Sequence, residues 1–103
     1  MKKIINYKKY DTDTAKEIAS MSSGGSYTDF KHYEETLYRK KTGEFFIFGE
    51  GGAMSKYCER AAYENMWTSG SRIVPLTLEE AQQWVMEFCD GDTYESLFGP
   101  VEE

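Results

Sequence analysis

The sequence has few of the residue types that build metal centres and disulfide frameworks. Its 103 residues include one histidine, two cysteines and two prolines. A structural zinc site needs four closely spaced Cys or His ligands, so His32, Cys58 and Cys89 cannot form one. In a chain without a secretory signal, two cysteines are expected to be free thiols rather than a disulfide. We therefore expect no metal and no cofactor.

Long apolar runs are also missing. No segment approaches the roughly 18 apolar residues of a membrane-spanning helix, and the basic start of the chain is not followed by the apolar core of a signal peptide. The composition is nevertheless 40% hydrophobic and 16% aromatic, which favours a folded chain over a disordered one. We expect a single cytoplasmic domain over residues 1–103 with no membrane partner.

Basic residues are absent from the last third of the chain. Residues 1–50 hold nine Lys and Arg against eight Asp and Glu, whereas residues 51–103 hold three against ten, and no basic residue follows Arg72. The net charge is −6. Such an acidic segment repels phosphate backbones and attracts basic protein surfaces. The pattern predicts a protein partner with a basic surface rather than direct binding to nucleic acid, and an acidic face that only aids solubility is the alternative.

Catalytic motifs are missing as well. Glu34 and Glu35 are adjacent, so a strand would place them on opposite faces, where they cannot act as an acid–base pair. The glycines at 49–52 lack both the third glycine of a dinucleotide-binding motif and the Gly-Lys-Ser/Thr of a P-loop. We interpret them as a tight turn that needs positive φ. The alternative interpretation is that residues 49–57 bind an anion or another ligand. We expect no enzymatic activity and no catalytic residues.

The pattern of elements predicts an α+β fold with a small antiparallel sheet in the order β-α-β-β-β-α. The clearest feature is a hairpin whose loop, Lys41-Thr42-Gly43, should place its glycine in the left-handed conformation and pair Lys40 with Glu44. The expected strands are residues 2–10, 35–40, 44–48 and 73–76, with a short helix at 15–20 and a loose helical turn at 53–62.

An amphipathic helix is expected near the C-terminus, packed on one face of the sheet. Thr77 and Glu80 have the spacing of a capping box, and Asp90-Gly91 should end the helix. We interpret Tyr94 to Phe98 as one more helical turn. The apolar residues that recur at helical spacing on one side of this helix are Leu78, Ala81, Trp84, Val85 and Phe88.

The acidic C-terminal helix and tail are the predicted binding site for the partner. Interfaces favour aromatic anchors within a charged rim. Tyr94 and Phe98 are the candidate anchors. The carboxylates that would supply the charge are Glu79, Glu80, Glu87, Asp90, Asp92 and Glu95.

Two alternatives stay open. In the first, the chain self-associates as a homodimer, through a hairpin face left uncovered or through an edge strand, and acts as a regulatory or accessory protein of a mobile element. In the second, it binds single-stranded nucleic acid weakly through the lysines of its N-terminal half, which are interleaved with Tyr7, Tyr10, Tyr33 and Tyr38.

Nearly half of the chain resembles a largely uncharacterised family of small bacterial proteins that are found on mobile elements and in chromosomes. The segments are YDTDTA at 10–15, ETLYRKKTGEFF at 35–46, GEGGAMSKY at 49–57 and IVPLTLEEA at 73–81. No catalytic residues are assigned to that family. By analogy with other small acidic proteins of such elements, the resemblance implies an inhibitor of host defence, of the anti-CRISPR or anti-restriction type, which docks on a basic nucleic-acid-handling protein such as a nuclease.

Overall fold

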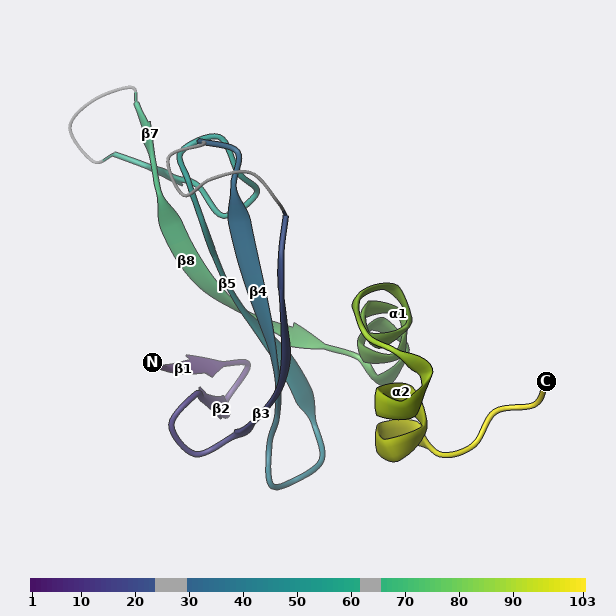
Figure 1. Ribbon diagram of the computed structural model, residues 1–103. Helices are drawn as coiled ribbons and strands as arrows, with labels where there is room; N and C mark the ends of the chain where they lie inside the picture. Colours follow the sequence, from purple (N-terminus) through teal and green to yellow (C-terminus); the bar gives the residue numbers. More distant parts are fainter. Residues whose placement is uncertain (24–29, 62–65) are drawn as a thin grey trace.

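The computed structural model describes residues 1–23, 30–61 and 66–103 (Figure 1). Within these residues the elements are β1 (Lys2–Ile5), β2 (Lys8–Asp11), β3 (Lys16–Ser22), β4 (Tyr33–Arg39), β5 (Phe45–Gly51), β6 (Glu59–Arg60), β7 (Trp67–Thr68), β8 (Gly70–Leu76), α1 (Leu78–Phe88) and α2 (Gly91–Phe98). The fold is α+β, as predicted.

The main sheet has four antiparallel strands in the order β3-β4-β5-β8. Its central β4–β5 hairpin has the predicted register, with Leu37 opposite Ile47. The N–H of Lys40 donates to the carbonyl of Glu44 at 2.8 Å, and Gly43 has a φ of 95°. The three-residue loop with a left-handed glycine is therefore confirmed.

The helix predicted at residues 15–20 is wrong, because this segment lies in β3 and pairs with β4. The polar residues that look like helix N-caps form a turn instead: Asp11 Oδ1 accepts from the N–H of Asp13 at 2.9 Å, and the Asp11 carbonyl accepts from Ala15. Asp side chains stabilise turns of this kind as readily as helix starts. A six-residue helix is marginal by itself, whereas β3 pairs with β4 on both sides of one irregularity between Glu17 and Ala19.

The loose helical turn predicted at residues 53–62 is also wrong. Residues 53–57 form tight turns, and the short strand β6 follows and pairs with β7. Residue 62 lies outside the described residues. The last predicted strand is confirmed and is longer than expected, since β8 begins at Gly70. Pro75 stands in this strand, and β8 lies at the edge of the sheet, where a residue without an N–H is tolerated.

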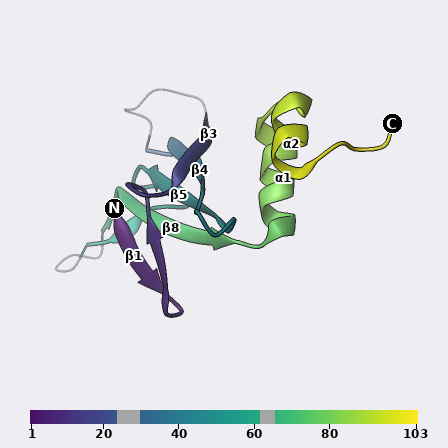
Figure 2. The same cartoon turned by 90° about the horizontal axis from the view of Figure 1, so that it is seen from below.

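The two helices and the β1–β2 hairpin lie on opposite sides of the main sheet (Figure 2). A hydrophobic cluster is buried on each face of the sheet. On one face, α1 and α2 cover a cluster of buried residues: Leu37, Phe45, Ile47, Ala81, Trp84 and Val85. On the other face, the β1–β2 hairpin brings Tyr10 onto Phe46 and Ile73. The β1–β2 hairpin thus covers apolar residues on the face of the β4–β5 hairpin that was considered for self-association. This placement weakens the case for self-association through that face.

The first helix, α1, begins at the cap that the sequence indicates, whereas Asp90, which was expected only to end α1, is also the N-cap of α2. Thr77 and Glu80 form the predicted capping box, in which Glu80 Oε1 accepts from the N–H of Thr77 at 2.9 Å and Thr77 Oγ1 accepts from the N–H of Glu80 at 3.2 Å. Asp90 caps α2 by accepting from the N–H of Thr93 at 2.9 Å. In the predicted apolar stripe Ala81, Trp84 and Val85 are buried, but Leu78 is 60% exposed and Phe88 37% exposed.

Candidate functional site

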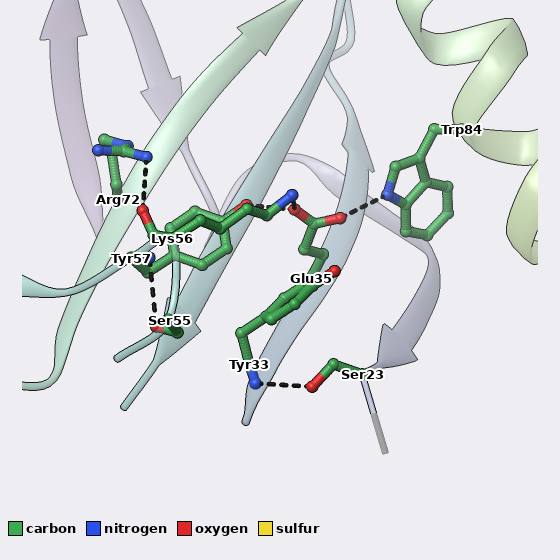
Figure 3. Close-up of polar contacts among 8 residues, drawn as sticks. All are labelled: Ser23, Tyr33, Glu35, Ser55, Lys56, Tyr57, Arg72 and Trp84. Carbon is green, nitrogen blue, oxygen red and sulfur yellow. Dashed lines mark hydrogen bonds and ion pairs between the residues drawn. The ribbon is translucent and has the colours of Figure 1, made fainter. Parts of the chain in front are cut away.

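The carboxylate of Glu35 joins three parts of the chain (Figure 3). Its Oε1 accepts from the indole N–H of Trp84 on α1 at 3.0 Å. Its Oε2 accepts from the hydroxyl of Tyr57 and lies 2.7 Å from the Nζ of Lys56. Glu35, Tyr57 and Trp84 are 3%, 3% and 7% exposed. This buried carboxylate is therefore fully hydrogen-bonded, as a charge in a protein interior must be.

The network changes the acidity of two of its members. Burial by itself raises the pKa of Glu35, but the hydrogen bonds from Lys56, Tyr57 and Trp84 together with the Lys56 charge outweigh burial and place the pKa below its ordinary value. The pKa of Tyr57 is raised by burial and then by the neighbouring Glu35 carboxylate. Glu35 is thus held as an anion and Tyr57 as a neutral donor. This arrangement stabilises the fold and has no general base that is ready to accept a proton at neutral pH.

The glycines of β5 allow the chain to fold back onto the sheet and reach Glu35. A Cβ at Gly49 would overlap the ring of Tyr57, and a Cβ at Gly51 would overlap the side chain of Ser55. The expectation of a tight turn with positive φ at residues 49–52 is wrong, because β5 continues to Gly51 and, among the described glycines, only Gly43 and Gly99 have positive φ. Gly49 is required for the close approach of Tyr57 instead.

Two cations flank the rings beside Glu35. The Nζ of Lys56 lies 4.9 Å from the centre of the Tyr33 ring and 5.5 Å from that of Tyr57, while the guanidinium carbon of Arg72 lies 5.3 Å from the Tyr57 ring. Arg72 also donates to the carbonyl of Lys56 at 3.3 Å. The Lys56 side chain is 53% exposed, so the pair it forms with Glu35 reaches the surface.

These residues form one wall of a groove between the sheet and α1. The groove has a volume of about 480 Å³. Its floor is apolar, and exposed residues of α1 form the opposite wall. The lining residues are Tyr33, Glu35, Ile47, Lys56, Tyr57, Arg72, Val74, Leu76, Glu80, Gln83, Trp84, Glu87 and Phe88.

A smaller recess of about 300 Å³ lies where α1 meets α2 and the C-terminal segment. Met86 and Val101 at this recess are 61% and 62% exposed. Burial, followed by the charge of Asp90, raises the pKa of the Cys89 thiol, which disfavours the reactive thiolate. Both cysteines are free, as predicted. The residues that line the recess are Met86, Cys89, Asp90, Gly91, Tyr94, Glu95 and Val101.

The six carboxylates predicted to bind a partner are all exposed on the helices. The structure places four of them at the two hollows. Glu80 and Glu87 line the groove, whereas Asp90 and Glu95 line the recess. Glu79 and Asp92 line neither hollow. We refer to the set Glu79, Glu80, Glu87, Asp90, Asp92 and Glu95 as the acidic face.

The two predicted aromatic anchors serve the packing of α2. Phe98 lies 5.5 Å from Phe45 of the sheet, and Tyr94 lies 4.9 Å from Phe98, as measured between ring centres. Both are partly buried against the core, although Tyr94 also lines the recess. The exposed apolar side chains that a partner would meet here are instead those of Met86 and Val101.

The Glu35 network was missed by the sequence reasoning. Its one available signal is that Glu35 and Leu37 share a face of a predicted strand, so that Glu35 is expected to lie beside buried residues. Nothing in the sequence pairs it with Lys56, Tyr57 or Trp84, because those residues follow it by 21 or more positions in loops and a helix.

A third hollow, of about 610 Å³, lies at the end of the sheet near β6. Among the described residues that line it, none has a large apolar side chain; these residues are His32, Glu34, Glu50, Gly51, Gly52, Glu59, Ser69, Gly70 and Ser71. Because binding energy at protein interfaces concentrates on buried apolar anchors, this hollow is a weaker candidate than the groove and the recess.

The four tyrosines named for nucleic-acid binding, all within the described residues, do not form one exposed platform. Tyr10 is buried, and Tyr38 stacks on Phe46 with 5.2 Å between ring centres. Tyr33 contacts Lys56, which leaves Tyr7 fully exposed at the tip of the β1–β2 hairpin. A binder of single-stranded nucleic acid needs several exposed rings in a row, so this placement disfavours that alternative.

Comparisons with known proteins give no family for this chain: no family model, no curated protein and no solved structure matches it. Among residues 1–23, 30–61 and 66–103, no group of three or more His, Cys, Asp or Glu side chains is placed to hold a metal ion. In the same residues, no helix has both the length and the apolar character needed to cross a membrane.

Proposed function

We propose that the chain is a non-catalytic binding protein whose acidic face docks on a basic protein surface. The observation that carries this proposal is the recess between α1 and α2, which has exposed apolar side chains at Met86 and Val101 and carboxylates at Asp90 and Glu95. Protein interfaces commonly combine an apolar centre with a charged rim.

The electrostatic field of the two helices supports this assignment. Neither helix has a basic residue in its last turn, so the negative ends of the helix dipoles are not neutralised there. Since no Lys or Arg follows Arg72, the carboxylates of the acidic face have no cation nearby in the sequence. Such a field speeds association with basic partners and selects against acidic ones.

Basic surfaces of this kind occur on proteins that hold nucleic acid. A chain with a net charge of −6 that covers one would compete with the phosphate backbone for the same Lys and Arg residues. The proposed outcome is inhibition of a nucleic-acid-handling protein, such as a nuclease of a host defence system. In this proposal the chain acts by occupying the surface and performs no chemistry.

The test is affinity capture from a bacterial lysate at low and high salt, with identification of the captured proteins by mass spectrometry. The matched variant is Glu87→Lys/Glu95→Lys, here called the helix variant, in which both lysines lie in last turns where a cation favours the helix dipole. We expect the native chain to capture a nucleic-acid-binding protein at low salt and to release it to added DNA. Equal capture by the helix variant would contradict the proposal.

A further inference from the structure

The groove between the sheet and α1 has an apolar floor that is open to solvent. Val74 and Leu76 of β8 are partly buried, and Phe88 of α1 is 37% exposed. The volume of about 480 Å³ falls within the range of roughly 300–1,000 Å³ that is typical of ligand sites. Side chains of a partner that enter this groove would remove apolar surface from water.

The two walls of the groove differ in charge. On the sheet side, the charge of Lys56 is largely balanced by Glu35 at 2.7 Å, and Arg72 contributes a cation held over Tyr57. On the helix side, Glu80 and Glu87 are exposed carboxylates. One oxygen of Glu80 accepts from Thr77 in the capping box, which leaves its other oxygen for a ligand. The groove as a whole favours a ligand that is basic on the helix side.

The spacing of the two carboxylates suggests the form of that ligand. Glu80 and Glu87 are seven residues apart, which is roughly 10 Å along a helix axis. An extended peptide in the polyproline II conformation covers the same distance in about three residues, since its rise is roughly 3.1 Å per residue, and its three residues per turn place side chains i and i+3 on the same side. Two basic side chains three positions apart would therefore meet the two carboxylates, and the residues between them would lie over the apolar floor.

We infer that this groove binds an extended peptide segment of the partner in which two basic residues flank apolar ones. This inference rests on the proposed function, because it names the part of the partner that the acidic face recognises. Glu80 and Glu87 bind the basic side chains, the Val74–Leu76–Phe88 floor contacts the apolar ones, and Arg72 donates to carbonyls of the segment. Lys56, which is paired with Glu35, holds the sheet wall in place.

The test follows the two indole N–H signals of the chain in a nitrogen–proton correlation spectrum. Trp84 lines the groove, whereas Trp67 is 59% exposed on β7 and does not line it, so Trp67 is an internal control. A Trp67→Phe variant assigns the two signals. The probe is the tetrapeptide Lys-Leu-Leu-Lys, blocked at both ends. We expect saturable shifts of the Trp84 signal and an unchanged Trp67 signal.

Two further peptides separate the contributions of charge and apolar contact. Glu-Leu-Leu-Glu should give no shift of the Trp84 signal, because the helix wall repels it. Lys-Ser-Ser-Lys should bind at least about tenfold more weakly than Lys-Leu-Leu-Lys, since it has no apolar side chains for the floor. Equal shifts with the leucine and serine peptides would overturn the assignment of the floor.

Single charge reversals locate the bound peptide. Glu87→Lys should weaken binding of Lys-Leu-Leu-Lys by at least about tenfold, whereas Glu95→Lys, at the recess, should leave it unchanged. Equal losses in both variants would place the peptide outside the groove and overturn the inference. An unshifted Trp84 signal at saturating peptide also overturns it.

The peptide test and the capture experiment can fail separately. If capture is lost in the helix variant and the Trp84 signal does not shift, the groove inference is overturned and the proposed function is still supported. If the Trp84 signal shifts but no basic protein is captured in a salt-sensitive way, the peptide-binding groove is supported and the proposed partner is contradicted.

Discussion

The indole N–H of Trp84 donates to Glu35 across 49 residues of sequence, at 3.0 Å, and so ties α1 to the second strand of the main sheet. α1 holds part of the acidic face and one wall of the groove. The position of the candidate site therefore depends on a polar contact as well as on the burial of Ala81 and Val85.

Replacement of Glu35 by Leu should destabilise the fold strongly. The buried donors of Trp84 and Tyr57 would lose their acceptor, at a cost of about 1–3 kcal/mol for each unsatisfied group. Glu35→Gln should cost less, because its amide oxygen still accepts one of these hydrogen bonds. Urea unfolding measures both changes. A Leu variant as stable as the native chain would show that the network contributes nothing to stability.

Glu35 should also make stability depend on pH in acid. Although burial raises its pKa, its three hydrogen-bond donors and the Lys56 charge lower the pKa in the folded state below 4.5, the ordinary value. Between the pKa of Glu35 in the folded chain and its ordinary value in the unfolded chain, the unfolded chain binds more protons than the folded chain. The free energy of unfolding therefore rises with pH in this range. The contribution of Glu35 is complete above pH 4.5 and is lost as the pH falls through the folded pKa.

The measurement for this prediction is the difference in unfolding free energy between the native chain and Glu35→Gln across acidic pH. The difference cancels the contributions of other carboxylates. Lys56→Met should narrow the pH range over which this difference changes, because it removes a hydrogen bond and a charge that lower the pKa of Glu35. A difference that stays constant with pH would show that the pKa of Glu35 is not lowered by folding.

Gly49→Ala should destabilise the fold through overlap with Tyr57, by about 1–3 kcal/mol or more. In a Tyr57→Leu background the same substitution should cost much less, because the ring that it displaces is gone. A double-mutant cycle measures this coupling. Gly91→Ala is the matched control, since an added Cβ there meets no atom within 4 Å and α2 begins at this residue. Additive effects of Gly49→Ala and Tyr57→Leu would refute the close approach.

Asp90 should contribute to stability as the N-cap of α2 and to binding as a charge. Hydrogen bonds from Thr93 lower the pKa of Asp90 and show that its carboxylate is used as a cap. Asp90→Ala should lower the thermal stability, whereas Asp90→Asn keeps the cap and removes the charge. Thermal unfolding should therefore separate the two variants, while partner binding should weaken in both. Equal thermal stability of the Ala and Asn variants would show that the cap is unimportant.

The local parts of the fold were predictable because their signals lie within a few residues. The capping box at Thr77 and Glu80 and the left-handed Gly43 each follow from short spacings, and both are confirmed. The register of the β4–β5 hairpin follows from the length of its loop. Such short-range rules need no knowledge of the tertiary structure.

The errors arose where tertiary contacts decide the outcome. The caps at residues 11–14 suit a turn as well as a helix, and pairing with β4 made the next segment a strand. The purpose of Gly49 was missed because the ring that it accommodates, Tyr57, is placed by a loop that the sequence does not fix. The carboxylates of the candidate site were predictable as exposed groups, but their division between groove and recess depends on how α1 and α2 pack.

The most direct test of the account compares two charge-reversed variants against the purified partner identified by capture. The helix variant and Glu17→Lys/Glu50→Lys have the same net charge, but the latter changes exposed residues of β3 and β5, away from the acidic face. We predict that calorimetry at low salt shows a loss in affinity of at least about tenfold for the helix variant only. Equal losses in both variants would show that overall charge, and not the acidic face, determines binding, and would contradict the account.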